Sequence, residues 1–474
     1  MLLFRGRARS IHQNKNSRRK YTINMCSGRI MPKMLLFAVP VMLTSILQLL
    51  FNAADIIVVG RFAGDNSLAA VGSNSSLIGL MTNLFVGVSI GTNVLVSRYY
   101  GSKNDDGISK AVSTSILVAI VSGVFLTIVG VVFARDILML MHTPAEVLGL
   151  ATLYLVIYFF GMTPMMIYNF GAAVLRASGD TRRPLFYLSV AGVINVILNL
   201  FFVIYLRLDV AGVAIATVIS QCVSASLVLR CLSREAGPMR LSLKGARIDL
   251  DNLLKILRIG VPAGLQGVLF SFSNVVIQSS INTFGAAVMA GSSASDNIET
   301  FVYFSMEAFY QATISFTSQN MGAGKVDRVY KVLKTGMICS IAVGLIFGLA
   351  VIIFSHQLLG IYTSSEAVKA VGIERLRVII MTYALCGLME VTGGVMRGIG
   401  YSVLPTVVTL LGVCVFRVIW VVGLLSIPAF HSVITVYLSY PVSWALTFGA
   451  HLVCFIWVKK HVLAKYQTKV PQTA

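Results

Sequence analysis

The feature that most constrains this chain is a series of apolar runs, each about 20 residues long, separated by short charged or turn-forming segments. Of its 474 residues, 57% are hydrophobic and 12% are charged, whereas soluble chains carry about 25% charged residues. The alternating strand-like segments that an outer-membrane barrel needs are absent from the sequence. We therefore predict an all-α polytopic membrane protein.

The apolar runs predict about twelve transmembrane helices. The spans expected in the first half are 34–60, 67–98, 108–133, 147–175, 183–206 and 210–232. Those expected in the second half are 252–283, 286–318, 330–354, 370–397, 403–425 and 432–458. The chain would then consist of a basic arm, a six-helix bundle, a linker, a second six-helix bundle and a tail, over residues 1–33, 34–232, 233–251, 252–458 and 459–474.

The basic residues predict the orientation in the membrane. The chain holds 38 Lys and Arg against 18 Asp and Glu, a formal net charge of +20. In a soluble protein this excess would suggest nucleic acid, but the basic residues gather in every second loop, as the positive-inside rule describes. We therefore expect a plasma-membrane protein (the inner membrane of a bacterium) with both termini in the cytoplasm and no nucleic acid partner.

The first 33 residues hold nine Lys and Arg, no acid, and no apolar core of the kind a signal peptide needs. They are either a flexible basic arm or an extension upstream of a start at Met25 or Met31.

The two halves of the sequence repeat each other at a nearly constant offset. LRASGDTRRP (175–184) corresponds to MRGIGYSVLP (396–405) at an offset of 221, and Pro40 corresponds to Pro262 at an offset of 222. Two sets of six helices place both halves in the same orientation, an arrangement typical of transporters that alternate access between their halves. A duplicated fold without transport activity is the alternative.

The stretch from Pro40 to Gly60 reads as one apolar helix with a single acid, Asp55. Thr44, Gln48 and Asn52 precede the acid at helical spacing, which predicts a polar face. An acid in the bilayer costs about 2.5–3.5 kcal/mol on insertion scales, so this face should look onto protein or water.

Asp55 has no counterpart in the second half, because the offset of 222 leads to Ile277. We therefore predict that Asp55 couples an ion to transport and that Pro40 kinks its helix. The alternative is a buried acid that only ties two helices together.

In the second half, four polar residues follow a strict four-residue spacing: Glu299, Tyr303, Glu307 and Gln311. Their surroundings are too polar to face lipid, so we predict that they line a substrate cavity in which carboxylates attract cationic solutes. Hydrogen bonding among helices is the alternative. Glu390 and Arg417 are expected to neutralise each other as a structural pair.

Two pairs in the first half also share helix faces, Asn195 with Asn199 and Tyr154 with Tyr158; ordinary helix–helix hydrogen bonding would explain either. The sequence shows no metal cluster, catalytic triad or Walker motif, and its 7 cysteines are scattered singly. We therefore expect no enzyme activity and no cofactor other than a coupling ion.

Several motifs together resemble the multidrug and toxic compound extrusion (MATE) family, in its DinF-like branch. In the first half they are FNAADIIVVGRF, LAAVG, VSRYYGSK, LRASGD and VAGVAIATVISQ; in the second half they are SFTSQNMGAGK and MRGIGYSVLP. The resemblance spans nearly the whole chain beyond residue 33. It implies two six-helix bundles that form a V-shaped cavity, and drug/cation antiport.

The resemblance also implies roles for single residues. Pro40 and Asp55 look like the bending proline and the cation-coupling aspartate of the family's first helix. A polar network of the first bundle would then serve Asp55, made of Gln48, Asn52, Tyr154, Asn195, Asn199 and Thr217. Archaeal members similar to this chain carry a second aspartate where this sequence has Asn199, and the acid on helix 7 of the NorM-like branch has no counterpart here.

The sequence thus predicts secondary-active efflux of amphipathic, cationic organic compounds by antiport with H⁺ or Na⁺. Desolvation of a lone carboxylate disfavours its charged form, so we favour H⁺; neutral oxygen ligands near Asp55 leave Na⁺ open. We expect small organic substrates and membrane lipid as partners, and a monomer. A lipid-linked oligosaccharide flippase of the same superfamily and a non-transporting membrane scaffold are the alternatives.

Overall fold

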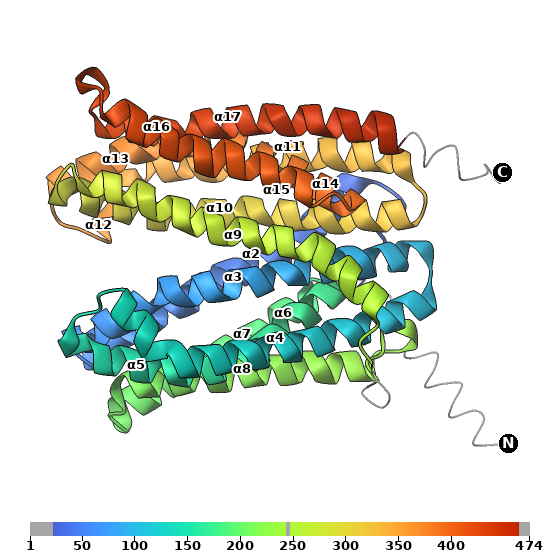
Figure 1. Cartoon of the computed structure of the whole chain (residues 1–474), viewed down its shortest axis with the longest axis horizontal. Helices are drawn as coiled ribbons and strands as arrows, with labels where there is room; N and C mark the ends of the chain where they lie inside the picture. The colour runs from blue at the N-terminus through green and yellow to red at the C-terminus, as the bar shows by residue number, and fades with distance from the viewer. Residues whose placement is uncertain (1–21, 243–246, 464–474) are drawn as a thin grey trace. The chain divides into compact units, whose positions relative to one another are not determined.

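The computed structural model describes residues 22–242 and 247–463, which are helical almost throughout and contain no β-strand (Figure 1). They form two compact units. Unit 1 consists of the described residues up to Asn24 and of Leu43–Gly264 (less 243–246), and unit 2 consists of Met25–Met42 and the described residues from Leu265 onward.

In unit 1, α6 lies against α3, α4 and α8. Its small residues permit this, because Gly171 faces the side chain of Val228 on α8. The helices that contribute to unit 1 are α2 (Ile30–Phe62), α3 (Asp65–Ser102), α4 (Asp105–Leu140), α5 (Ala145–Phe160), α6 (Met162–Ala177), α7 (Arg182–Leu200), α8 (Asp209–Arg234) and α9 (Leu250–Asn282). A π-helix, Phe201–Tyr205, continues α7.

In unit 2, α10 packs against α11, α13 and α14, and α14 also contacts α17. Gly394 and Gly398 of α14 face Tyr310 and Thr317 of α10, with no room for a larger side chain. Besides the first part of α2 and the last part of α9, the helices of unit 2 are α10 (Ala286–Gly322), α11 (Val326–Ile353), α12 (Ser355–Gly360), α13 (Glu366–Ile380), α14 (Tyr383–Ile399), α15 (Val403–Thr409), α16 (Phe416–Leu425) and α17 (Val433–Val458). A π-helix, Leu410–Val415, joins α15 to α16.

The repeat seen in the sequence is also present in the fold. Corresponding helices begin 221 residues apart: α3 at 65 and α10 at 286, α5 at 145 and α13 at 366, α7 at 182 and α15 at 403. Ser97 Oγ donates to the carbonyl of Ala177, and Ser318 Oγ donates to the carbonyl of Gly398 at the same offset. The same relation holds for Asn74 with Ala151 and Ser295 with Gly372.

Two predicted spans are broken rather than continuous. The span expected at 147–175 consists of α5 and α6, bent by 46°, and the span expected at 370–397 consists of α13 and α14, bent by 43°. Pro164 explains the first break, because its ring would clash with the carbonyl of Phe160, where α5 ends. At the second break, Thr382 Oγ1 donates to the carbonyls of Val378 and Ile379, and side-chain bonds of this type bend helices.

By length and composition, nine helices of the described residues could cross a membrane, or 11 if each bent pair is one span. α10 has 37 residues but is not among them, because of its polar sequence. Most of its residues from Gly291 to Met321 are buried, and it packs against α11, α13 and α14.

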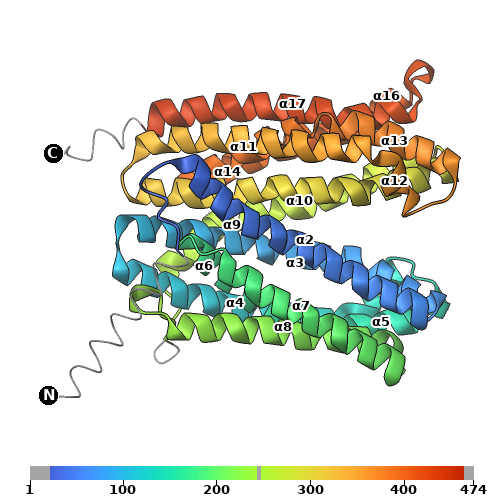
Figure 2. The same cartoon turned by 180° about the vertical axis from the view of Figure 1, so that it is seen from behind.

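α2 runs as one helix through Pro40, and its path can be followed in Figure 2. The division between the units falls two residues after Pro40 and, in α9, two residues after Pro262. The kink at Pro40 stays a prediction.

The predicted basic arm lies largely outside the described residues, as do the core of the linker (243–246) and the tail from 464. The last residues of the basic arm belong to unit 2. Met25 is fully buried, and its carbonyl accepts hydrogen bonds from Asn320 Nδ2 (3.2 Å) and Arg328 Nη2 (3.3 Å). Cys26 Sγ lies 3.9 Å from Gln319 Oε1.

The loop between α6 and α7 is held by charge. Asp180 is fully buried and ion-paired to Arg183, which also pairs with Glu235 at the end of α8. Gly179 closes α6 with a φ of 91°, a left-handed conformation that a side chain disfavours.

Candidate functional site

The polar site of unit 1 is built around Asp55 of α2. Its carboxylate is 8% exposed and accepts hydrogen bonds from Asn199 Nδ2 of α7 and from Thr217 Oγ1 of α8 (3.4 Å). Asn195, one turn before Asn199, accepts from Asn199 Nδ2 (3.3 Å) and donates to Thr217 Oγ1 (3.3 Å). The network therefore closes on itself across three helices.

Local structure places these side chains. Gly192 of α7 lies directly under the ring of Phe51, which lets α2 approach α7 closely. The four-residue step from Asn195 to Asn199 stacks both amides on the face toward α2. The π-helix Phe201–Tyr205 begins two residues after Asn199, and such segments are frequent at functional sites.

Asp55 has donors around it but no cation. Among the residues that the structure describes, no Lys, Arg or His forms an ion pair with it. The Oδ1 atom of Asn199 is buried and has no hydrogen-bond partner in the same set of residues. A buried acid without a counter-ion, beside an unused acceptor, is an arrangement that can take up a proton or a small cation.

Tyr154 lies at the edge of this site, but Gln48 and Asn52 do not join the hydrogen-bonded network. Tyr154 is buried, packs against Tyr158 with ring centroids 5.8 Å apart and the ring planes tilted by 31°, and interacts electrostatically with Asp55. Gln48 and Asn52 are exposed, whereas Thr44 of the same predicted face is buried. Their predicted place in the network is corrected accordingly.

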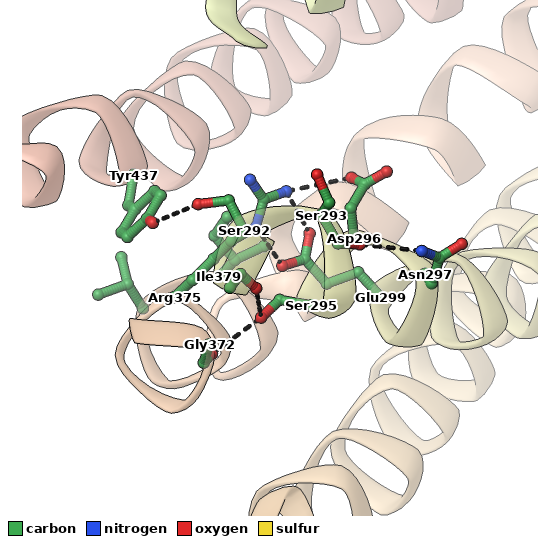
Figure 3. A network of polar contacts seen from close by, with 12 residues as sticks. Ser292, Ser293, Ser295, Asp296, Asn297, Glu299, Gly372, Arg375, Ile379 and Tyr437 are labelled. Atoms are coloured by element: carbon green, nitrogen blue, oxygen red, sulfur yellow. Dashed lines mark hydrogen bonds and ion pairs between the residues drawn. The ribbon is translucent and has the colours of Figure 1, made fainter. Parts of the chain in front are cut away.

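Glu299 of unit 2 is held in a buried ion pair. It is 3% exposed and accepts two bonds from Arg375 of α13, from Nε at 2.8 Å and from Nη2 at 3.0 Å (Figure 3). The same Nη2 donates to Asp296 at 3.1 Å. This corrects the prediction that Glu299, Tyr303, Glu307 and Gln311 share one face.

Glu307 and Gln311 remain together further along α10. Both are half-buried, and Gln311 Nε2 donates to Glu307 Oε1 at 3.4 Å. Glu390 of α14, also half-buried, interacts electrostatically with Glu307 and Arg397, and Tyr303 interacts with both glutamates. Arg397 is held by Tyr310 of α10 and Gln266 of α9.

The expected pair of Glu390 with Arg417 is wrong in this structure. Arg417 Nε donates to Ser443 Oγ at 2.8 Å, and its guanidinium lies over the rings of Tyr440 (4.2 Å) and Trp444 (5.4 Å). Its Nη2 is buried without a partner among the described residues. Glu390 instead shares a face of α14 with Arg397, seven residues later, a spacing that the sequence already contained.

In the described part of the chain, no group of three or more His, Cys, Asp or Glu could hold a metal ion.

Comparison with known proteins identifies the family of this chain. Two stretches of the chain, residues 40–201 and 262–422, match the model of the MatE family. The chain is 28% identical over 440 residues to "Probable multidrug resistance protein YoeA" of Bacillus subtilis, covering 90% of this chain and 94% of that protein. It is 23% identical to "Probable multidrug resistance protein NorM" of Thermotoga maritima, covering 82% and 84%.

The fold agrees with this assignment. A solved structure titled "Crystal structure of MATE in complex with MaL6" superposes with a TM-score of 0.86 at 22% identity, covering 94% of this chain and 99% of that one. Both family matches fall on the internal repeat, one in each half. The family resemblance drawn from the sequence is confirmed: this multi-pass membrane protein belongs to the MatE family, whose members are transporters and not enzymes.

Proposed function

We propose that this protein exports amphipathic organic cations in exchange for protons that bind at Asp55. The observation that carries the proposal is a buried carboxylate with hydrogen-bond donors and no ion-pair partner among the described residues. An acid in a membrane span is a functional hypothesis by default. The relatives described as multidrug resistance proteins support export of drug-like compounds.

The donors around Asp55 support a proton over sodium. Asn199 and Thr217 both turn N–H or O–H groups toward the carboxylate. Sodium needs oxygen ligands, so the Asn199 amide would have to turn, and the hydroxyl hydrogen of Thr217 would have to point elsewhere, before these groups could contribute to its coordination. A proton asks for a smaller change, because it binds one carboxylate oxygen directly and the Thr217 hydroxyl can donate to the carbonyl of Val213 instead.

One proton per cycle supplies enough energy for useful export. Moving one charge through 100 mV is worth about 2.3 kcal/mol. At about 1.36 kcal/mol per factor of ten, this would sustain roughly a 50-fold gradient of a neutral substrate. Exchange of one proton for one monovalent cation moves no net charge, so the pH difference alone drives it and sustains about a tenfold gradient per pH unit.

The acidic cluster of unit 2 supports a preference for cations. Glu307 and Glu390 are two half-buried carboxylates that interact electrostatically, and Arg397 also interacts with Glu390. Two carboxylates beside the ring of Tyr303 suit an aromatic or amphipathic cation. The substrate residues of unit 2 that we propose are therefore Tyr303, Glu307, Gln311 and Glu390.

The basic loops support a plasma-membrane location with both termini in the cytoplasm. We take the monomer to be the functional form.

Efflux of a fluorescent dye cation from proteoliposomes, under imposed pH or sodium gradients, tests the proposal. A pH gradient without sodium should drive efflux in the wild type and fail to do so in Asp55→Asn. Full efflux by Asp55→Asn would contradict the coupling role, and strict sodium dependence at constant pH would contradict the choice of ion.

The substrate site is tested separately with a neutral dye of similar size. Glu307→Gln should weaken binding of the cationic dye more than that of the neutral dye, because only the cation gains from the carboxylate. Equal losses for both dyes would assign Glu307 a structural role.

A further inference from the structure

We propose that Arg375 is a permanent internal counter-cation for Glu299, which keeps this buried carboxylate from exchanging protons or cations during transport. The geometry is that of a closed pair. Nε and Nη2 of Arg375 hold both oxygens of Glu299 at 2.8 and 3.0 Å, and both side chains are almost fully buried, at 2% and 3% exposed. Figure 3 shows the guanidinium lying between Glu299 and Asp296.

The pair is fixed from several sides. The rings of Tyr437 and Tyr440 on α17 lie 5.7 and 5.8 Å from the guanidinium carbon. Ser292 Oγ and Tyr437 OH are hydrogen-bonded at 2.7 Å, which holds one of these rings in place. The bidentate bond gives both oxygens of Glu299 a charged donor, whereas the donors to the two oxygens of Asp55 are neutral.

Five charged or titratable groups of the described residues interact with Glu299. They are Asp296 on α10, Arg375 on α13, Tyr383 on α14, and Tyr437 and Tyr440 on α17. Arg375 is the one cation among them. Asp296 is 67% exposed and receives one bond from Arg375, whereas the buried Glu299 receives two, so the arginine chiefly neutralises Glu299.

The internal repeat shows what differs between the halves. Arg375 lies 221 residues after Tyr154, at the corresponding position of the corresponding helix. In unit 1 this position holds an uncharged phenol, and the nearby Asp55 has no cation. In unit 2 it holds a guanidinium, and the nearby acid is paired. The inference rests on the proposed function, since it assigns ion exchange to the half without the arginine.

Proton binding by the purified, full-length protein tests this inference. A weakly buffered sample is moved from mildly alkaline to mildly acidic pH with an indicator dye, and the protons bound per transporter are counted. Arg375→Gln should bind about one proton more than the wild type, because Glu299 becomes free to titrate. Arg375→Lys should bind no extra proton, since the positive charge is kept.

Two further variants separate charge from structure. The matched control is Arg377→Gln, which removes the same charge from an exposed position of the same helix and should match the wild type. The double variant Arg375→Gln/Glu299→Gln replaces the pair by neutral groups of similar shape, which buried sites often tolerate. It should bind as many protons as the wild type. Fewer would show that Glu299 titrates in the native protein and would overturn the inference, even if Arg375→Gln does not fold.

Failure of the proposed function gives a different result. If Asp55→Asn binds as many protons as the wild type, the coupling role of Asp55 is refuted. The extra proton of Arg375→Gln would still appear in the Asp55→Asn background. An Arg375→Gln protein that folds and binds no extra proton would refute the role of Arg375 alone.

Discussion

The network of unit 1 allows its negative charge to be moved from α2 to α7 with little change in shape. Asp55 and Asn199 are joined by one hydrogen bond, and aspartate and asparagine have nearly the same shape. The exchange Asp55→Asn with Asn199→Asp keeps this bond with donor and acceptor reversed. We expect the double variant to regain the proton-driven efflux that Asp55→Asn loses.

The single variant Asn199→Asp shows how strongly a second carboxylate would change the proton affinity of the site. It places two carboxylates at hydrogen-bond distance, about 3 Å, where their repulsion at an effective dielectric constant of 20 is about 5.5 kcal/mol. This corresponds to about four powers of ten in proton affinity. The two acids would therefore share one proton at neutral pH and release it poorly. Efflux at neutral pH should slow, and it should recover when the pH is raised on the side of the membrane to which the proton is released.

Dye efflux from proteoliposomes measures all four proteins. With the wild type as reference, Asp55→Asn should be uncoupled, Asn199→Asp slow at neutral pH, and the double variant within about tenfold of the wild-type rate, since one neutral hydrogen bond is worth about 1 kcal/mol. A double variant with normal yield and melting temperature but no proton-driven efflux would refute the reasoning. Position 55 itself, and not the network, would then carry the function.

Three further predictions follow from the loops and packing. Gly179→Ala should lower the free energy of unfolding by at least about 1 kcal/mol, because a methyl group there meets the backbone of Ile23 at a positive φ; Gly149→Ala, which meets nothing within 4 Å, is the control. Burial raises the pKa of the Cys26 thiol above 9.0, so maleimide labelling at this site, taken as the difference from Cys26→Ser, should be slow at neutral pH and rise as the pH approaches that raised pKa. Asp180→Asn should destabilise the protein by about 1–3 kcal/mol in thermal unfolding, whereas Asp106→Asn, from an exposed pair, should change stability by less than about 0.5 kcal/mol.

The helical fold and the repeat could be predicted from the sequence because both depend on pattern. Long apolar runs indicate helices that contact lipid, and a constant sequence offset indicates a duplicated fold. Neither prediction depends on which side chains contact each other. The broken spans were harder to predict. Pro164 sits within an apolar run that is long enough to cross the membrane unbroken, and the break at Thr382 depends on one side-chain hydrogen bond.

The partners within the sites were predicted less well, because a strict four-residue spacing is not one helix face. Each step of four residues overshoots a full turn by about 40°. By this count Asn52 lies about 80° from Thr44, whereas Asp55 lies only about 20° from it, in agreement with the burial of Thr44 and Asp55 and the exposure of Asn52. The same drift separates Glu299, turned toward α13, from Glu307.

Arg375 was missed because nothing in its local sequence distinguishes a paired arginine from one near a helix end. A signal did exist in the repeat: the residue 221 positions earlier is Tyr154, already singled out beside Asp55. The comparison used for Asp55 and Ile277, applied to the helices that face the acid, would have found it.

The two halves differ where charge is involved and agree where packing is involved. The bond of Ser97 to Ala177 reappears as that of Ser318 to Gly398, because the same helix crossing has to be held in each half. Asp55 has no such counterpart, and Glu299 has a cation that Asp55 lacks. A duplicated fold whose halves both exchanged ions would need both to be loaded and emptied in step. Restricting exchange to one half removes that requirement, so the asymmetry of charge within a symmetric frame is what we expect of a transporter that couples one ion to each cycle.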